Sequence, residues 1–134
     1  MRAIVEFAER PLDWEIKAVG DLAHVYVREN IEEVQKDEGT AFTAIEYSVD
    51  MKASDKLVMS DELASEIIAY ETAKKAAEVR KMRNQLLVKS DSYMLSDRPE
   101  SESIISKWKA YREALRDLPE QSGFPWDVVF PEKP

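Results

Sequence analysis

The chain has 134 residues, of which 44% are hydrophobic and 34% are charged, a composition typical of one globular domain rather than of a disordered chain. Its formal net charge of −8 argues against a protein that binds nucleic-acid backbones. The chain contains no cysteine, which excludes disulfides, thiolate zinc sites and cysteine nucleophiles. No apolar run has the length of a signal-peptide core or of a transmembrane helix, so we expect a soluble protein with no membrane partner.

The first half of the sequence is acidic and alternates between apolar and polar residues. Residues 1–73 carry 7 Lys and Arg against 17 Asp and Glu. Alternation with a period of two is typical of half-buried strands, and it occurs around Trp14, Val25 and Ile45. Together with the apolar stretch near the start, it predicts four strands, at about residues 2–8, 13–19, 22–28 and 41–52. Short connections favour an antiparallel meander, and the acidic stretch NIEEVQKDEG (30–39) is interpreted as a solvated loop.

The sequence changes to a helical period after residue 59. Apolar residues at helical spacing and a high alanine content predict a helix from about residue 60 to residue 89. Ser60 is the expected N-cap. Asp61 and Glu62 suit the positive end of the helix dipole, and Lys89 suits the negative end.

A second helix is expected from about residue 100 to residue 117, after a polar break at residues 91–99. Its apolar residues occupy the seam positions of a heptad pattern: Ile104, Trp108, Tyr111, Leu115 and Leu118. We expect the two helices to form an antiparallel hairpin. The expected contacts across it are Leu86 and Leu87 with Ile104, Met82 with Trp108, and Val79 with Tyr111.

These expectations describe an α+β fold. A small N-terminal antiparallel β region, residues 1–56, precedes a helical hairpin with an extended C-terminal segment, residues 57–134. A small sheet with one open apolar face is only marginally stable. The first helix is therefore expected to cover the sheet and to pair with the second helix.

The stretch GFPWDVVFPEKP (123–134) is apolar, and its prolines forbid a continuing helix. We expect a strap that folds back along the hairpin, with Phe124 and Trp126 over the apolar seam. Gly123 is expected to reverse the chain with a positive φ. The alternative is a segment that waits for a partner.

The sequence offers no arrangement of residues for catalysis or for a cofactor. His24 is the only histidine, and it is expected on the solvent side of a strand. With glycine at three positions, no phosphate-binding loop can be written. Carboxylates are so abundant that a pair at a catalytic separation carries little weight. We expect no catalytic, cofactor-binding or metal-binding residues, and a small enzyme that uses carboxylates is the least favoured interpretation.

The second half also carries a motif pattern. The stretches AEVRKMRNQLLVKSDSYMLSDRP (77–99) and WKAYREALRDLPEQSGFPWDVVFPEKP (108–134) resemble the C-terminal region of the tail assembly chaperone and tail-fibre-assembly proteins of bacteriophages and prophages. The matching residues are Arg80, Arg83, Asn84, Leu86, Leu87, Ser90, Asp91, Leu95, Asp97, Trp108, Tyr111, Arg112, Ala114, Leu115, Arg116, Asp117, Leu118, Pro119, Gly123, Phe124, Pro125 and Pro131. Two positions differ, because Ser92 and Tyr93 replace a usual tryptophan and Phe130 replaces another.

The resemblance implies a small non-enzymatic accessory that helps a tail or tail-fibre protein to assemble in the bacterial host cytoplasm. A structural tail or baseplate component that remains in the particle is the alternative. The residues expected to bind the partner are Trp108, Tyr111, Arg112, Arg116, Phe124 and Trp126. The sequence leaves open the identity of the client and whether the chain forms a homo-oligomer.

Most of these residues also have a structural interpretation. Trp108 and Tyr111 are favoured as ordinary core residues. Arg112 and Arg116 can pair with neighbouring acidic residues of the same helix, or belong to a basic rim that steers an acidic client. The basic run between Lys74 and Arg83 is interpreted as a solvated helix face rather than a grip on an acidic surface.

Overall fold

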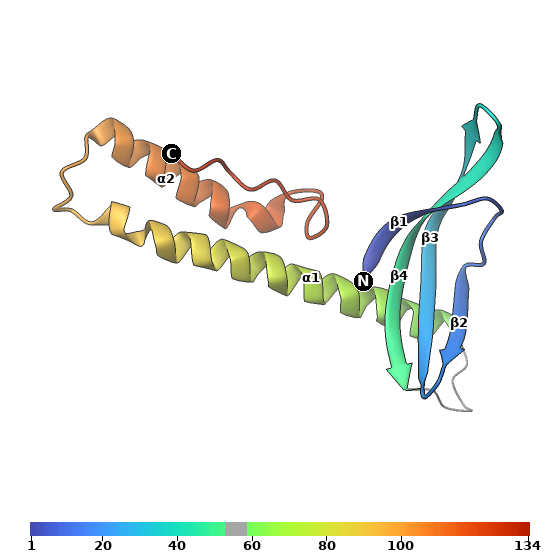
Figure 1. Ribbon diagram of the computed structural model, residues 1–134. Coiled ribbons are helices and arrows are strands. Elements are labelled where there is room, and N and C mark those ends of the chain that lie inside the picture. Colours follow the sequence, from blue (N-terminus) through green and yellow to red (C-terminus); the bar gives the residue numbers. More distant parts are fainter. Residues whose placement is uncertain (53–58) are drawn as a thin grey trace. The chain divides into compact units, whose positions relative to one another are not determined.

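The computed structural model describes residues 1–52 and 59–134, and these divide into two compact units, Met1–Glu71 and Thr72–Pro134. The elements are β1 (Arg2–Phe7), β2 (Trp14–Val19), β3 (Leu22–Lys36), β4 (Gly39–Lys52), α1 (Asp61–Ser90), the short 3-10 helix η1 (Asp91–Met94), α2 (Glu102–Arg116) and the short 3-10 helix η2 (Leu118–Glu120) (Figure 1). The predicted α+β class, with an antiparallel sheet followed by two helices, is confirmed. The predicted boundary between residues 56 and 57 lies outside the described residues.

The order of the strands differs from the predicted meander. The sheet order is β1-β4-β3-β2, with every neighbouring pair antiparallel. Only β2, β3 and β4 follow one another as hairpins, and β1 lies beside β4, which is the order of a Greek key. Residues 8–13 therefore cross from one edge of the sheet to the other (Figure 1). Alternation identified the strands, but it carries no information about which strand pairs with which.

The acidic stretch 30–39 is largely strand, so its interpretation as a loop was wrong. β3 continues to Lys36, and β4 begins at Gly39. The two strands shift register between Glu29 and Glu32, where Asn30 has a φ of 50°. Beyond this bulge they form a ribbon whose acidic side chains are exposed. Backbone pairing continues there because the charged side chains remain in water.

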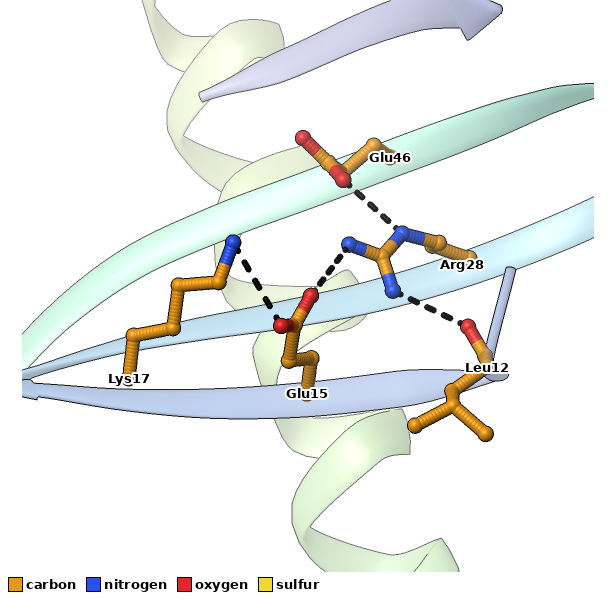
Figure 2. A network of polar contacts seen from close by, with 5 residues as sticks. All are labelled: Leu12, Glu15, Lys17, Arg28 and Glu46. Atoms are coloured by element: carbon orange, nitrogen blue, oxygen red, sulfur yellow. Dashed lines mark hydrogen bonds and ion pairs between the residues drawn. The ribbon is translucent and has the colours of Figure 1, made fainter. Parts of the chain in front are cut away.

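The two faces of the sheet differ as the alternation predicted. Ala23, Val25 and Val27 of β3 are buried, together with Tyr47 of β4. The intervening residues of β3 point to the opposite face, where His24 pairs with Asp50 across the strands. The first turns of α1 lie on the side of the sheet that carries the buried residues (Figure 2). The helix begins as predicted, because the Oγ of Ser60 accepts a hydrogen bond of 3.1 Å from the Leu63 N–H.

Arg28 joins the strands on the face away from α1 (Figure 2). Its guanidinium donates to Glu46 Oε2 of β4 at 2.8 Å, to Glu15 Oε2 of β2 at 3.1 Å and to the Leu12 carbonyl at 3.0 Å. The guanidinium carbon also lies 5.0 Å from the ring centroid of Phe7 in β1. The side chain is 4% exposed, so these partners must stabilise its buried positive charge in place of water. Arg28 thus contacts all four strands or their connections.

Replacing Arg28 by leucine should lower the free energy of unfolding by about 3–5 kcal/mol, because two carboxylates lose their shared cation. Arg28 also lowers the pKa of Glu15 from its ordinary value of 4.5. A carboxyl with a lowered pKa stabilises the fold above pH 4.5 and loses that contribution as the pH falls through the lowered value. Arg28→Leu should therefore show a smaller acid-induced loss of stability than the parent.

Urea unfolding at about pH 7 and about pH 3 measures both effects. Arg10→Leu is the matched control, since Arg10 is exposed and lies 3.5 Å from Asp13. It should change stability by less than about 1 kcal/mol. Equal effects of the two substitutions would contradict the assigned role of Arg28.

The core of the second unit is aromatic. Trp108, Tyr111, Leu115 and Leu118 form a buried cluster. The ring of Tyr93, from η1, stacks on Trp108 with a centroid distance of 3.7 Å, and Tyr111 meets Trp108 edge-on at 5.7 Å. The partly buried apolar residues packed on the cluster are Leu86, Leu87, Tyr93, Met94, Val128 and Phe130.

The contacts across the hairpin differ from those predicted. Met82 and Ile104 are 45% and 43% exposed, so neither is the seam residue that the heptad pattern predicted. Val79 is buried, and its predicted contact with Tyr111 stays a prediction. The heptad pattern considered only two helices, whereas η1 and the C-terminal segment supply the ring of Tyr93 and the side chains of Val128 and Phe130.

Truncation of Trp108 to alanine should lower the free energy of unfolding by about 3–5 kcal/mol, because it removes a large side chain from a closed core. Ile104→Ala, one helical turn earlier and largely exposed, should cost less than about 1 kcal/mol. Thermal unfolding of both variants tests this. A Trp108→Ala protein that melts with the parent would show that the ring lies outside the core.

Residues 121–134 form an ordered segment after α2. The Gln121 side-chain amide exchanges two hydrogen bonds with the backbone of Val129, at 2.8 and 2.9 Å. The Gly123 carbonyl accepts from the Trp126 and Asp127 N–H groups at 2.9 and 2.7 Å. Pro125 is buried, and Val128 and Phe130 pack against the core.

The predicted conformation of Gly123 was wrong. Positive φ values occur at Gly20 and Gly39 but not at Gly123. A Cβ atom at Gly123 would lie 2.2 Å from the carbonyl oxygen of Asp127 and 2.8 Å from the Asp127 Cβ. The turn needs glycine because the backbone of Asp127 occupies the space of a side chain, not because the chain reverses through the left-handed region.

Gly123→Ala should therefore lower the free energy of unfolding by at least about 1–3 kcal/mol, since backbone must move to admit the methyl group. The neighbouring Ser122 is exposed, and Ser122→Ala provides the control with a near-neutral effect. Denaturant unfolding followed by tryptophan fluorescence measures both. An unchanged midpoint for Gly123→Ala would mean that the turn around Asp127 is looser than described.

Candidate functional site

The six residues predicted to bind a partner all lie in the second unit, but they differ in exposure. Trp108 and Tyr111 are 4% and 7% exposed. Their rings fill the core and contact each other, and Tyr93 stacks on Trp108. In this structure they support the surface rather than form it.

Arg112 fastens the end of α1 to α2. Its Nη1 lies 2.7 Å from the Leu87 carbonyl, from the Ser90 Oγ and from Asp91 Oδ1. The Ser90 hydroxyl in turn donates to the Leu87 carbonyl at 2.9 Å. A cation at the C-terminal end of a helix meets unpaired carbonyls and the negative end of the dipole. Arg112 therefore acts within the fold, through residues on α1 and η1 rather than on its own helix.

Arg116 is exposed. With Met94, Lys109, Arg112, Glu113 and Asp117 it lines a hollow of about 580 Å³, which we call the α2 hollow. The two arginines are one helical turn apart, yet only Arg112 is largely buried. Sequence spacing could not separate their roles, because the partners of Arg112 lie 22 and 25 residues away in the chain.

Arg112→Ala should lower the free energy of unfolding by about 1.5–3 kcal/mol, the range for hydrogen bonds of a charged group. Arg116→Ala is the matched control and should stay within about 0.5 kcal/mol of the parent. Chemical denaturation compares the two variants. A larger loss for Arg116→Ala than for Arg112→Ala would reverse the assignment.

Phe124 and Trp126 are partly buried in the ordered C-terminal segment. The guanidinium carbon of Arg80 on α1 lies 5.1 Å from the centroid of the Phe124 ring, within the range of a cation–π contact. This contact joins the segment to α1. Val128 and Phe130 pack on the core cluster, and the predicted position of Phe124 and Trp126 over the apolar seam stays a prediction.

A second surface, on α1, overlaps the basic run between Lys74 and Arg83 that was interpreted as a solvated helix face. A hollow of about 820 Å³ runs along one face of the helix, and we call it the α1 groove. It is lined by Ala77, Arg80, Lys81, Asn84, Gln85, Val88 and Lys89. From Ala77 onward, these residues lie three and four positions further along at each helical turn, so they form one stripe on the helix. All of the charged residues in the lining are basic, although the whole chain carries a net charge of −8.

The turn between the helices carries its own ion pair. Arg98 and Glu100 pair closely, and the Arg98 guanidinium lies 4.3 Å from the ring centroid of Tyr93. The hydrogen bond from Arg98 lowers the pKa of Glu100. Tyr93 is thus covered by Arg98 as well as by Trp108.

Two further observations concern the described residues alone. No group of three or more histidine, aspartate or glutamate side chains in residues 1–52 and 59–134 is placed to hold a metal ion. In the same ranges, no helix combines the length and apolar character needed to cross a membrane.

Comparison with known proteins finds a family match for one part of the chain. Residues 76–134 match the family of phage tail assembly chaperone proteins. The matched region is the second unit without its first four residues, and it confirms the resemblance seen in the sequence. No curated protein and no solved structure matches the chain.

Proposed function

We propose that this protein is a non-catalytic phage or prophage tail assembly chaperone that binds a tail or tail-fibre protein through its second unit, in the cytoplasm of the host. The family match carries the proposal, because it covers the second unit and leaves the sheet outside. A function shared with that family is expected to reside in the matched residues.

The residues of the motif fall into two groups. Many are accounted for by the fold, since they fill the core, fasten the end of α1 or permit the close turn at Gly123. Packing does not account for the exposed polar members Asn84 and Arg116, and Arg80 is exposed apart from its contact with Phe124. Arg80 and Asn84 stand one turn apart in the α1 groove. Exposed motif residues that serve no packing role are the better candidates for client contacts.

The C-terminal residues Gly123–Pro134 are proposed to act as the strap expected from the sequence. The packing of Val128 and Phe130 on the core supports this role. So does the position of Lys133, whose Nζ lies 5.7 Å from the Trp108 ring centroid. Through Phe124 the strap adds an aromatic edge beside Arg80. The client-binding surface then combines the α1 groove with this edge.

The chemistry of the surface favours an acidic client segment with an apolar side chain. Arg80, Lys81 and Lys89 supply positive charge, and Val88, which is 69% exposed, supplies apolar contact. Complementary charge speeds association and weakens as salt screens it. The affinity for the client should therefore fall as the ionic strength rises.

Co-expression with the tail and tail-fibre proteins encoded beside this chain tests the proposal. The parent chain should form a soluble complex with one of them or raise its solubility. Lys81→Glu combined with Lys89→Glu should reduce the yield of complex by about tenfold or more, because two attractive charges of the α1 groove become repulsive. The α2 hollow is tested in the same way as a rival surface, by Lys109→Glu combined with Arg116→Glu, which changes the net charge equally.

Loss of the complex only in the α1 variant supports the groove as the binding surface. Loss only in the α2 variant overturns that placement in favour of the α2 hollow. Failure of the parent chain to bind any tail protein, or its stoichiometric recovery in finished particles, overturns the chaperone role.

A further inference from the structure

The strand β2 forms one edge of the sheet. The order β1-β4-β3-β2 leaves the outer side of β2 without a neighbouring strand among the described residues. An edge strand presents a row of N–H and C=O groups that another strand can pair with. Four large apolar side chains at or beside this strand are also exposed: Leu12 (69%), Trp14 (47%), Val19 (57%) and Leu22 (46%).

The pairing with β3 determines which backbone groups of β2 point outward. The Arg28 N–H donates to the Asp13 carbonyl at 2.8 Å, and the register places Trp14 opposite Val27. Hydrogen-bonded pairs alternate along an antiparallel ladder, so the odd-numbered residues of β2 bond to β3. The N–H and C=O groups of Trp14, Ile16 and Ala18 therefore face away from β3, toward the open edge.

The side chains of β2 are complementary to those of a second, antiparallel copy of the same strand. Glu15 and Lys17 flank Ile16, and their charged groups lie 3.4 Å apart on the same face of the sheet. An antiparallel copy centred on Ile16 brings Glu15 opposite Lys17 of the second copy, and Lys17 opposite its Glu15. It also sets Trp14 opposite Ala18, so that each large ring covers a small side chain.

We propose that β2 pairs with β2 of a second copy of this chain, about a two-fold axis at Ile16. In this pairing, Ile16 hydrogen-bonds to Ile16 of the second copy, and Trp14 hydrogen-bonds to its Ala18. These are the residues whose backbone groups face the open edge. Arg28 holds Glu15 in position at 3.1 Å, so the carboxylate is fixed before the copy arrives. The two sheets join into one sheet of eight strands.

The other edge strand, β1, would also set opposite charges together about Ile4, Arg2 with Glu6 of a second copy. The exposed apolar side chains separate the two edges. They are Met1 (71%) and Ile4 (74%) at β1, against four at or beside β2. The β1 edge therefore serves as the internal control. Pairing through β2 uses no residue of the second unit, so it is independent of the proposed client surface.

A cysteine at position 16 reports the register directly, because the natural chain contains no cysteine. The Cα atoms of a hydrogen-bonded antiparallel pair are about 5.5 Å apart, within the range that a disulfide spans. Full-length Ile16→Cys should form a disulfide-linked dimer under mild oxidation. Ala18→Cys should not, since its two copies lie roughly 14 Å apart along the strands. Ile4→Cys, on the opposite edge, should also stay monomeric.

Lys17→Glu tests the pairing without a cross-link. It sets two like-charged pairs across the axis and should weaken dimerisation about tenfold or more in sedimentation equilibrium. The control is Lys36→Glu, another exposed strand lysine, which should leave the equilibrium unchanged. Circular dichroism confirms that both variants keep the sheet.

Three results would overturn the proposal: a parent chain that is monomeric at its highest soluble concentration, cross-linking of Ile4→Cys as efficient as that of Ile16→Cys, or a dimer insensitive to Lys17→Glu. Cross-linking of Ile16→Cys alone, with weaker association of Lys17→Glu, establishes the two-fold pairing.

Discussion

The contact of Arg112 with the end of α1 is the interaction on which the second unit depends. One guanidinium nitrogen reaches the Leu87 carbonyl, the Ser90 hydroxyl and the Asp91 carboxylate, all at 2.7 Å. These groups lie where α1 ends and η1 begins, so the contact determines where the chain turns. Tyr93 follows two residues later and stacks on Trp108. The core that receives Val128 and Phe130 is therefore built around this turn.

The sequence predicted the elements better than their arrangement. The first helix was expected at residues 60–89 and spans Asp61–Ser90, because capping by Ser60 and the helical period are local signals. Strand order is not local. The neighbour of β1 is decided by the path of residues 8–13 across the sheet and by the burial of Arg28, and no periodicity records either. The acidic ribbon was missed because its charges were taken as a sign of a loop, although exposed strand positions accept them.

The candidate site could also be predicted only in part from the sequence. The sequence left Arg112 between a structural role and a basic rim, and the structural role rests on partners in α1 that spacing along α2 could not reveal. Arg80 and Lys81 of the α1 groove were interpreted as part of a solvated helix face, because a run of basic residues on a helix usually faces only water. The signal that was present is the spacing of Arg80 and Asn84, two motif residues on one exposed stripe. Gly123 was expected to adopt a positive φ, whereas the turn needs glycine because the Asp127 backbone lies close to it. Such a close approach of two backbone segments cannot be read from the sequence pattern.

The packing of Val128 and Phe130 on the core cluster also bears on the order in which the protein folds during synthesis. A ribosome releases the residues of the first unit, up to Glu71, before those of the second, and domains generally fold as units during synthesis. The sheet can therefore form while α2 is still being translated. The core of the second unit is completed only after Val128 and Phe130 have been made, because both pack on it. A nascent chain thus passes through an interval in which the first unit can be folded while the core of the second is still incomplete, and slower translation of the last residues would lengthen that interval.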